Sequence, residues 1–482
     1  MSLNSPFFLF VFLPLVLVIS WLFGRRLRLG WLLLASLFFY AWGQILYTPV
    51  ILLSVLANYS FGIWISRSAG QPHKSRRITT LAVIINLALL AFFKGLVTYW
   101  PQIASAFGGK VMTLGRYIEL PLGISFYSFA AVSYLIDVYK DRVRPEGRLE
   151  RFALFLMLFP KVTAGPIMRY RDLAGSLAGV GNLPDDRVTI QIETIASGAR
   201  RFIIGLAKKI LIADRLAMVS DQGIFNQALP NLTTIQAWFV LLCFALQIYY
   251  DFSGYTDMAI GLGQMLGFRF VENFNYPYIS RSLSEFWRRW HISLSQWFRD
   301  YLFYPLERRR RGAGGILPYL NILIVFLATG LWHGVTLNFI IWGLIHGFAI
   351  SLEVSPLGRW LRALPQGLQH LYALAVILLG WVFFRSNNPA FAVGFLGELS
   401  GIHPGSGIMP FLMFPSVQPL TWMALFVGVV FAMPVSTWIG GMLKEKKGTI
   451  WWIRDAGALV LLASSLVVMA GSAYSPYIYG GF

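Results

Sequence analysis

Histidines in an uncharged part of the chain are the first candidates for chemistry. Residues 312–352 contain no Asp, Glu, Lys or Arg, and His333 and His346 lie within them. An imidazole held where water is scarce can take the proton of a hydroxyl group, which is the role of a general base in acyl transfer. Because 13 residues separate the two histidines, they would point in different directions on one straight helix. The sequence therefore predicts either a helix break near Gly334 or two separate roles.

A third histidine, His291, lies in a segment rich in aromatic residues, "SLSEFWRRWHISLSQWFRDYLFYPL". Its apolar residues recur every three or four positions, which predicts one amphipathic helix that Ser284 could cap. The residues one and two turns away are Trp287, Leu294 and Phe298, which places this histidine on the apolar face. A histidine on such a face is more often a buried core residue than a catalyst, and both interpretations stay open at this point.

Two carboxylates, Asp251 and Asp257, interrupt the apolar segment "QIYYDFSGYTDMAIGLGQMLGF". Ionisable groups at membrane depth are costly and often mark function. The more frequent outcome is an ion pair, here with an arginine such as Arg269 or Arg281. The alternatives are the cap of a broken helix, direct catalysis or metal binding. The sequence has no HxH, HExxH or cysteine pattern typical of a zinc site, so we expect no metal.

The composition indicates that a membrane surrounds most of these elements. Of the 482 residues, 57% are hydrophobic and 13% are charged, whereas soluble domains are about 45–50% apolar and about 25% charged. A soluble protein of this size could not bury so much apolar surface. The single cysteine, Cys243, excludes an internal disulfide and a cysteine-based cluster. The predicted fold class is therefore an all-α polytopic membrane protein.

The positions of the basic residues predict how the chain crosses the membrane. Lys and Arg number 40 against 21 Asp and Glu, a net charge of +19, and cytoplasmic loops are enriched in basic residues. Basic loops follow the first, third and fifth apolar spans, so the N-terminus is predicted to lie outside the cytoplasm. Lys444, Lys446 and Lys447 precede the last span, which predicts that the C-terminus also lies outside, and nucleic acid is not needed to explain the charge. About eleven crossings are expected, near residues 1–23, 31–48, 50–65, 78–99, 120–139, 233–250, 316–336, 337–352, 371–384, 411–435 and 451–470.

Two segments do not fit a simple crossing. The apolar part of "FALFLMLFPKVTAGPIMRYRD" is shorter than the roughly 20 residues of a transmembrane helix and contains Pro and Gly. Broken backbone at membrane depth must be sheltered by protein, which favours a re-entrant or partly buried segment. In "ASGARRFIIGLAKKILIADRL", basic residues are interleaved with an apolar stripe, which predicts a helix lying in the membrane interface. These basic residues are Arg200, Arg201, Lys208 and Lys209.

Several segments together resemble the membrane-bound O-acyltransferase (MBOAT) family, and within it the membrane subunits of bacterial alginate O-acetyltransferases. They include "LPLGISFYSFAAVSYLIDVYKD", "LFPKVTAGPIMRYRDL", "FIIGLAKKILIAD", "GLWHGVTLNFIIWGLIHG", "GWVFFRS" and the long block from "YYDFSGYTDMAIG" to "WFRDYLFYPL". The resemblance implies a ring of helices around a thin core that is crossed by a funnel or tunnel. We expect one membrane domain over 1–482, with the MBOAT core at about 120–385, flanking spans at 5–100 and 386–473, and an aromatic tail at 474–482.

The resemblance also implies roles for individual residues. The family's invariant histidine corresponds to His333 in "GLWHG", and its second polar position corresponds to His291, 42 residues earlier. By this resemblance, His333 acts as general base or transient nucleophile, and His291 orients it or the acyl group. Candidates for a supporting role are His346, Trp332, Asp251 and Asp257.

The C-terminal residues "SPYIYGGF" resemble an aromatic motif of relatives that pass the acyl group outward. Tyr479 corresponds to the tyrosine of that motif, while Tyr477 and Gly480–Gly481 depart from it. An acyl relay on Tyr479 and a plain aromatic anchor at the membrane surface are the two alternatives.

The resemblance implies that acetyl-CoA is the cytoplasmic acyl donor and that no cofactor is bound. The run Arg308–Arg311 is interpreted as a surface anchor that could also attract the donor's phosphates. Other basic candidates for binding the donor are Arg288, Arg289, Lys208 and Lys209.

The expected function is the transfer of an acetyl group across a bacterial inner membrane to hydroxyls of an exported, alginate-like polysaccharide. Membrane lipids and acetyltransferase subunits outside the cytoplasm are the expected partners. Cellulose or peptidoglycan are alternative acceptors. A proton-coupled transporter or flippase and a non-catalytic scaffold are competing classes, although the doubled repeat of many transporters is not visible in the sequence.

Overall fold

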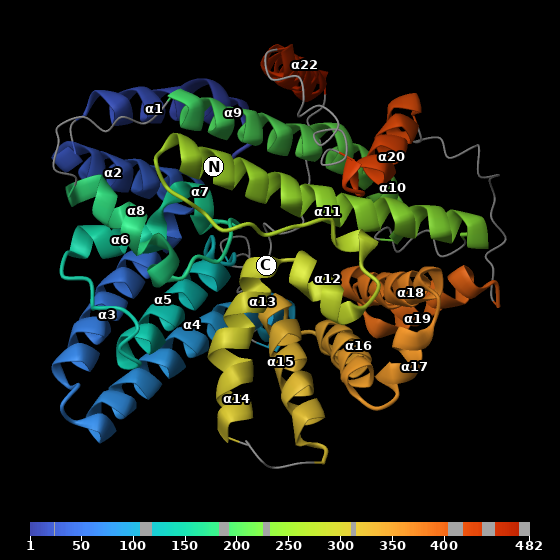
Figure 1. Ribbon diagram of the computed structural model, residues 1–482, viewed down its shortest axis with the longest axis horizontal. Helices are drawn as coiled ribbons and strands as arrows, with labels where there is room; N and C mark the ends of the chain where they lie inside the picture. The colour runs from blue at the N-terminus through green and yellow to red at the C-terminus, as the bar shows by residue number, and fades with distance from the viewer. Residues whose placement is uncertain are drawn as a thin grey trace. The chain divides into compact units, whose positions relative to one another are not determined.

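The computed structural model describes residues 1–23, 25–106, 118–182, 192–224, 232–309, 315–402, 418–435 and 449–471. All regular secondary structure in these ranges is helical, which confirms the predicted all-α class (Figure 1). The residues form two compact units, whose boundaries fall within α9 (Ile192–Ala207), within α11 (Thr234–Met265) and between Glu272 and Asn273. Unit 1 comprises Met1–Phe202 and Tyr255–Glu272, and unit 2 comprises Ile203–Gly254 and the described residues from Asn273 onward.

In unit 1, α3, α4 and α5 pack against one another, and α2 packs on α6. The amides of Asn58 on α3 and Asn86 on α4 exchange two hydrogen bonds of 2.8 and 3.1 Å, which join these apolar helices where water is scarce. The elements before α9 are η1 (Phe8–Phe12), α1 (Leu13–Leu22), α2 (Arg25–Gln44), η2 (Ile45–Tyr47), α3 (Thr48–Arg67), α4 (Pro72–Ala106), α5 (Ile124–Tyr139), α6 (Leu149–Met157), α7 (Phe159–Val162) and α8 (Tyr170–Asn182).

The segment 152–162 was expected to have an interrupted helix that protein shelters, and the structure shows both features. α6 ends at Met157, α7 is a single short turn, and every residue from Phe152 to Val162 is buried. Gly123, at φ +69°, faces this segment so closely that a Cβ atom would lie 1.8 Å from the carbonyl oxygen of Val162. Protein therefore surrounds the interrupted backbone, as polar backbone at membrane depth requires.

In unit 2, α15 packs along α16, and α16 packs on α18. Glycines allow the first of these contacts, because a Cβ on Gly330 would lie 2.2 Å from the carbonyl oxygen of Phe339, and one on Gly343 would lie 2.5 Å from that of Phe326. The elements other than α9 and α11 are η4 (Lys208–Ala213), α10 (Asp214–Ile224), η5 (Pro277–Ile279), α12 (Leu283–Arg289), α13 (Ile292–Phe298), η6 (Arg299–Phe303), α14 (Tyr304–Arg309), α15 (Leu317–His333), α16 (Leu337–Val354), α17 (Gly358–Ala363), α18 (Gln366–Arg385), α19 (Pro389–Ser400), α20 (Pro419–Phe431) and α22 (Thr449–Gly471).

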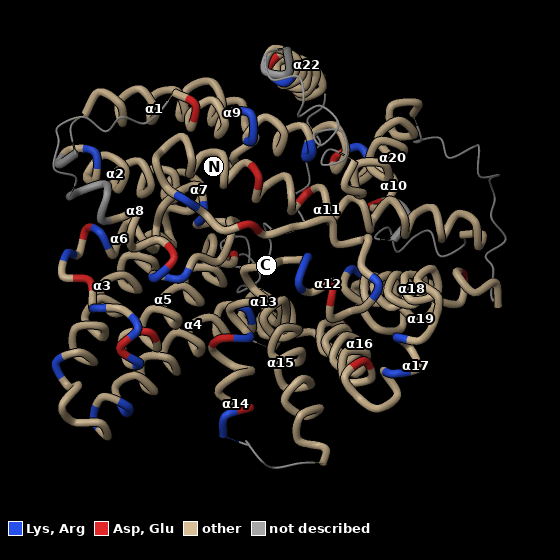
Figure 2. Tube along the Cα trace, viewed as in Figure 1, with Lys and Arg blue, Asp and Glu red and all other residues tan. Residues whose placement is uncertain are grey.

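Apolar helices of membrane-spanning length confirm that the chain is a multi-pass membrane protein. The described residues contain six helical stretches that are long and apolar enough to cross a membrane, and four shorter apolar helices. Figure 2 shows α15 without a charged residue, as the uncharged stretch of the sequence requires. The number of crossings, about eleven, stays a prediction, as do the positions of both termini outside the cytoplasm.

The carboxylates of α11 form ion pairs, although with other partners than Arg269 or Arg281. In unit 1, a guanidinium nitrogen of Arg201 lies 2.8 Å from Asp257, and Arg201 also pairs with Glu272. In unit 2, Lys209 Nζ lies 2.7 Å from Asp251 and 2.6 Å from Asp214. Two of the four basic residues of the predicted interfacial helix, Arg201 and Lys209, therefore neutralise carboxylates. The position of this helix in the membrane interface stays a prediction.

Candidate active site

A break between two short helices positions His291. α12 ends at Arg289, Trp290 is extended, and His291 has a left-handed backbone with φ 45° and ψ 53° before α13 begins. The prediction of one continuous amphipathic helix is therefore wrong at this point. The cap is also two residues earlier than predicted, because the Ser282 side chain accepts a hydrogen bond from the backbone N–H of Glu285. The break turns His291 away from the regular helical register.

His291 is completely buried, and its surroundings determine which nitrogen carries the proton. Asn273 Oδ1 accepts hydrogen bonds from the backbone N–H (3.1 Å) and the hydroxyl (2.9 Å) of Ser293, so this side of the amide is the oxygen. His291 Nδ1–H donates to the same oxygen at 3.2 Å. Burial lowers the pKa of His291 to about 3, so the imidazole is neutral and Nε2 holds the lone pair.

His333 is the last residue of α15. Gly334, with extended backbone, ends the helix, and α16 begins three residues later, so the first of the two predicted alternatives, a helix break near Gly334, is the one observed. The exposed fraction of His333 is 3%. A Cβ on Gly334 would lie 2.3 Å from the ring of Phe339, so this glycine admits an aromatic side chain beside the histidine.

Aromatic rings connect the three histidines. The ring centroid of Trp332 lies 5.9 Å from His291 and 4.8 Å from His333, so this tryptophan contacts both. Trp342 contacts His333 at 5.1 Å and His346 at 4.8 Å. The structure thus brings the three predicted histidines and Trp332 into one cluster. Rings of this kind exclude water, which strengthens every polar interaction inside the cluster.

His346 is fully buried on α16 and is held from α12. The indole N–H of Trp287 donates to His346 Nδ1 at 3.3 Å. Glu353, at the end of the same helix, accepts hydrogen bonds from the backbone N–H groups of Leu283 (2.5 Å) and Ser284 (3.0 Å). Both ends of α12 are therefore tied to α16.

Sequence reasoning did not identify Asn273, Trp342 or Glu353. Asn273 precedes His291 by 18 residues in "ENFNYP", and no periodicity connects the two. Trp342 lies four residues before His346, a spacing that places both on one face of a helix, and this signal could have identified it.

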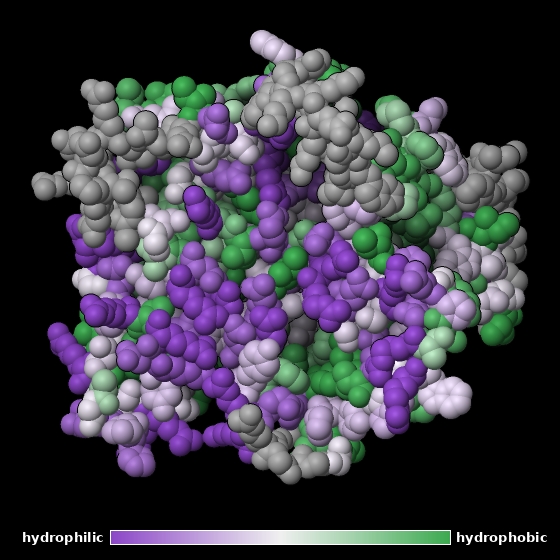
Figure 3. Space-filling view, in the orientation of Figure 1, coloured by the Kyte–Doolittle hydropathy of each residue, from purple (hydrophilic) through white to green (hydrophobic). Residues whose placement is uncertain are grey.

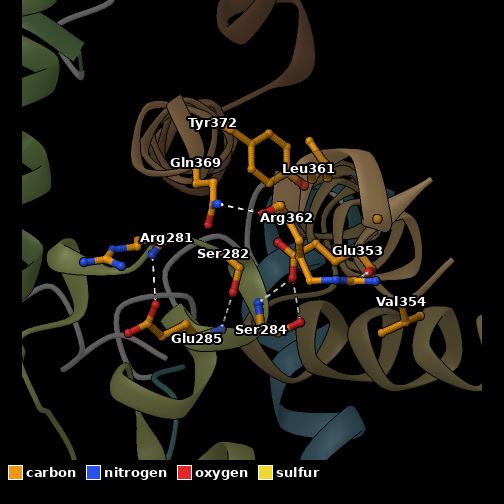
Figure 4. A pocket seen from close by; sticks show the side chains of 11 residues that line it. Arg281, Ser282, Ser284, Glu285, Glu353, Val354, Leu361, Arg362, Gln369 and Tyr372 are labelled. Carbon is orange, nitrogen blue, oxygen red and sulfur yellow. Dashed lines mark hydrogen bonds between the residues drawn. The ribbon is translucent and has the colours of Figure 1, made fainter. Parts of the chain in front are cut away.

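A polar pocket lies beside the first turn of α12. It has a volume of about 370 Å³ and is lined by residues that include Arg281, Ser284, Glu353, Arg362 and Tyr372 (Figure 4). The hydroxyl of Tyr372 is buried and has no hydrogen-bond partner among the described residues. Figure 3 shows hydrophilic side chains over α12 and hydrophobic ones over neighbouring α16. The pocket could hold a polar group next to the apolar surface.

The basic residues predicted to bind the acyl donor differ in their exposure and in their ion pairs. Arg288 is exposed at the end of α12, and Arg289 pairs with Glu285 at 2.9 Å. Lys208 is half-buried on η4. The ammonium of Lys209 is buried and already pairs with two carboxylates, so it is not available to a phosphate, and its predicted role in donor binding is wrong.

Two predictions concern residues outside the described part of the chain. Tyr479 belongs to the tail beyond residue 471, and Arg310 and Arg311 belong to 310–314. The other two members of that run, Arg308 and Arg309, form the last turn of α14. The acyl relay on Tyr479 therefore stays a prediction.

Buried imidazoles in a water-poor cluster of a multi-pass membrane protein are suited to proton transfer, which both a membrane enzyme and a proton-coupled transporter require. Comparison with known proteins identifies the reaction class. The model of the MBOAT, membrane-bound O-acyltransferase family matches residues 34–365. The chain belongs to the membrane-bound O-acyltransferase family.

Relatives that match most or all of the chain agree with this assignment. The chain is 35% identical over 506 residues to the probable alginate O-acetylase AlgI of Pseudomonas putida, covering 100% of both chains. It is 40% identical over 394 residues to the protein of the same name in Pseudomonas aeruginosa, covering 80% of this chain and 72% of the relative. It is also 31% identical over 525 residues to the peptidoglycan O-acetyltransferase of Helicobacter pylori, covering 99% and 97%. The chain is therefore a membrane-bound O-acyltransferase.

Proposed function

We propose that the chain moves an acetyl group from acetyl-CoA, supplied on the cytoplasmic side of a bacterial inner membrane, toward hydroxyls of an exported, alginate-like polysaccharide. The observation that carries the proposal is the burial of His333 at the end of α15, in ring contact with Trp332, which also contacts His291. The full-length similarity to alginate O-acetylases supports the acceptor class.

In the proposed reaction, His333 takes the proton of the attacking hydroxyl. The hydroxyl oxygen bonds to the thioester carbonyl carbon, and the carbonyl electron pair moves to its oxygen. The tetrahedral intermediate then collapses, the carbon–sulfur bond breaks, and the departing thiolate takes the proton from His333. Neutral His291, whose Nδ1 is anchored by Asn273, offers its Nε2 lone pair to orient the partners.

The polar pocket is the proposed entrance for the polar part of the donor. Arg281 and Arg362 are among the residues that line it, and the buried Tyr372 hydroxyl has no hydrogen-bond partner in the described part of the chain. Phosphates and amides of a CoA molecule need donors of this kind. Arg288 and Arg289, on the adjacent helix, remain candidates for the same task.

The proposal is tested by the acetyl content of exported polymer in cells whose own gene is replaced by the variant. His333→Ala should reduce acetylation to background while the protein still inserts. His73→Ala, at an exposed position on α4, is the matched histidine control and should keep it. Acetylation retained in His333→Ala cells would refute the role of His333.

Peptidoglycan is the second candidate acceptor, because the similarity to the Helicobacter pylori enzyme also covers nearly the whole chain. Measuring O-acetyl groups on uronic-acid polymer and on peptidoglycan in the same cells separates the two. We propose that acetyltransferase subunits outside the cytoplasm complete the transfer. Label that passes from acetyl-CoA to the chain and is lost in Tyr479→Phe would support the relay, and unchanged labelling would exclude it.

A further inference from the structure

A second cavity, with a volume of about 740 Å³, lies in unit 1 where α3 ends, α4 begins and α5 ends. The helical stretches that meet there, Leu27–Arg67 and Pro72–Ala106, are both long and apolar enough to cross a membrane. A turn between two spanning helices cannot lie in the hydrocarbon layer, because its backbone needs water or protein as hydrogen-bond partner. The cavity therefore lies at the level of the lipid headgroups.

Two opposite charges line this cavity. They belong to Asp141 and Arg144, which follow the end of α5. Neither side chain forms an ion pair or hydrogen bond with another residue in the described part of the chain. Ser66 of α3 and Ser75 of α4 line the cavity as well. Two separate charges that sum to zero are complementary to a ligand that is itself a zwitterion.

The loop that carries both charges is held at its two ends. The backbone N–H of Arg142 donates to the carbonyl oxygen of Asp137 at 2.8 Å, and the guanidinium of Arg142 pairs with the Asp137 carboxylate at 3.2 Å. Further along, the backbone N–H of Glu146 donates to the hydroxyl of Tyr134 at 3.1 Å. The cavity is therefore formed before a ligand binds, which lowers the entropic cost of binding.

The residues near the cavity are typical of a membrane surface. Figure 2 shows basic residues where α3 ends and α4 begins, and Arg67, Lys74 and Arg76 are exposed there. The exposed aromatic residues are Tyr139, which lines the cavity, and Trp64, near the end of α3. Such residues anchor a protein among lipid headgroups. Apolar side chains are exposed along the rest of α3 and α4, which offers acyl chains a surface next to the cavity.

We propose that the cavity binds the headgroup of phosphatidylethanolamine, a phospholipid that carries a phosphate and a primary ammonium. Arg144 pairs with the phosphate, and Asp141 accepts hydrogen bonds from the ammonium. Pockets with basic residues between transmembrane helices are known recognition sites for lipid headgroups. The inference goes beyond the proposed acyl transfer, since none of these residues belongs to the histidine cluster.

The test uses the purified full chain in detergent and counts bound lipids by native mass spectrometry. One phosphatidylethanolamine should bind at least about 10-fold more tightly than phosphatidylcholine, which has no ammonium N–H group, or phosphatidylglycerol, which has no ammonium, when the acyl chains are identical. Arg144→Ala should weaken the binding of phosphatidylethanolamine by about 10-fold or more. Asp141→Asn should abolish the preference over phosphatidylcholine, and asparagine tolerates the left-handed backbone of this residue, whose φ is 53°.

Arg76→Ala is the matched control, because Arg76 is exposed on α4 and is not among the described residues that line the cavity. Its affinity for phosphatidylethanolamine should stay near the wild-type value. Equal losses in Arg144→Ala and Arg76→Ala would overturn the inference, because attraction to a basic surface would then explain the binding.

Three further outcomes would also overturn the inference. They are equal binding of the three lipids, unchanged binding in folded Arg144→Ala and Asp141→Asn, and binding of soluble phosphoethanolamine as tight as that of the lipid. The last result would show that the acyl chains contribute nothing. No acyl donor is present in these measurements, so their result does not depend on the role of His333, and His333→Ala should bind the lipid as the wild type does.

Discussion

Two groups of buried polar side chains are stabilised in opposite ways. Around Lys209, the groups are ionised and touch each other, with distances of 2.6 Å to Asp214 and 2.7 Å to Asp251. In the histidine cluster, His291 and His346 are neutral imidazoles that lie among aromatic rings and make hydrogen bonds to neutral side chains.

The difference separates structure from chemistry. A buried carboxylate that already pairs with an ammonium is costly to protonate, because protonation breaks the pair. A neutral imidazole keeps a lone pair and can accept a proton during the reaction. Buried charge alone therefore does not mark the active site of this chain, and the ion-pair interpretation of Asp251 and Asp257 is confirmed.

The largest effect on stability is expected from removing the Lys209 ammonium from its ion pairs with Asp214 and Asp251. Lys209→Met leaves Asp214 and Asp251 without their shared partner, which should lower the free energy of unfolding by about 3–5 kcal/mol. Thermal unfolding of the purified chain in detergent measures the change. Lys208→Met, at the adjacent half-buried position, is the control and should cost much less. Equal losses for the two variants would contradict a structural role for this ion cluster.

A smaller loss of stability is expected when the pH is lowered, because His291 in the histidine cluster is buried as a neutral imidazole. The pKa of His291 is about 3 in the folded protein and about 6.5 in the unfolded chain, so between these values the unfolded state binds the extra proton. Stability should therefore fall as the pH drops below 6.5, by about 1.4 kcal/mol per unit and about 2 kcal/mol at pH 5.

His291→Asn tests this acid effect, because asparagine tolerates the left-handed backbone and does not titrate. The melting temperature of this variant should change less between pH 7 and pH 5 than that of the wild type. His73→Asn, at an exposed position, should keep the wild-type slope. An unchanged slope in His291→Asn would show that another group causes the acid sensitivity.

The smallest effect is expected at the start of α12, the helix that carries Trp287 toward His346. Ser282→Ala removes the cap of this helix and should cost about 1 kcal/mol, whereas Ser282→Asn keeps a capping oxygen and should cost less. Thermal unfolding distinguishes the two variants. If they were equally stable, the cap would contribute nothing to the position of α12.

Much of the fold follows from local patterns in the sequence. The spacing of apolar residues predicts the helices, and Gly334 correctly predicts the end of α15 between the two histidines. Burial of His291 also follows from its aromatic neighbours. These features depend on residues within a few turns of each other, which is the range that periodicity reports.

The remaining features depend on contacts between distant segments. Lys209 precedes Asp251 by 42 residues, so composition near Asp251 favoured the wrong partners. The left-handed conformation of His291 is hidden in a run of residues with helical spacing, because only the packing of α12 and the oxygen of Asn273 require it. The contacts of Trp342 with His333 and His346 do not follow from the sequence, because a tryptophan in an apolar helix is ordinarily a lipid or core contact.

The most direct test of the account measures activity and stability together in nanodiscs for His333→Ala and Lys209→Met. We expect His333→Ala to lose at least about 10²-fold in acetyl transfer from acetyl-CoA with a nearly unchanged melting temperature. We expect Lys209→Met to melt at a much lower temperature while the molecules that remain folded keep their rate. Wild-type transfer by His333→Ala, or loss of transfer in fully folded Lys209→Met, would contradict the division between catalytic imidazoles and structural ion pairs.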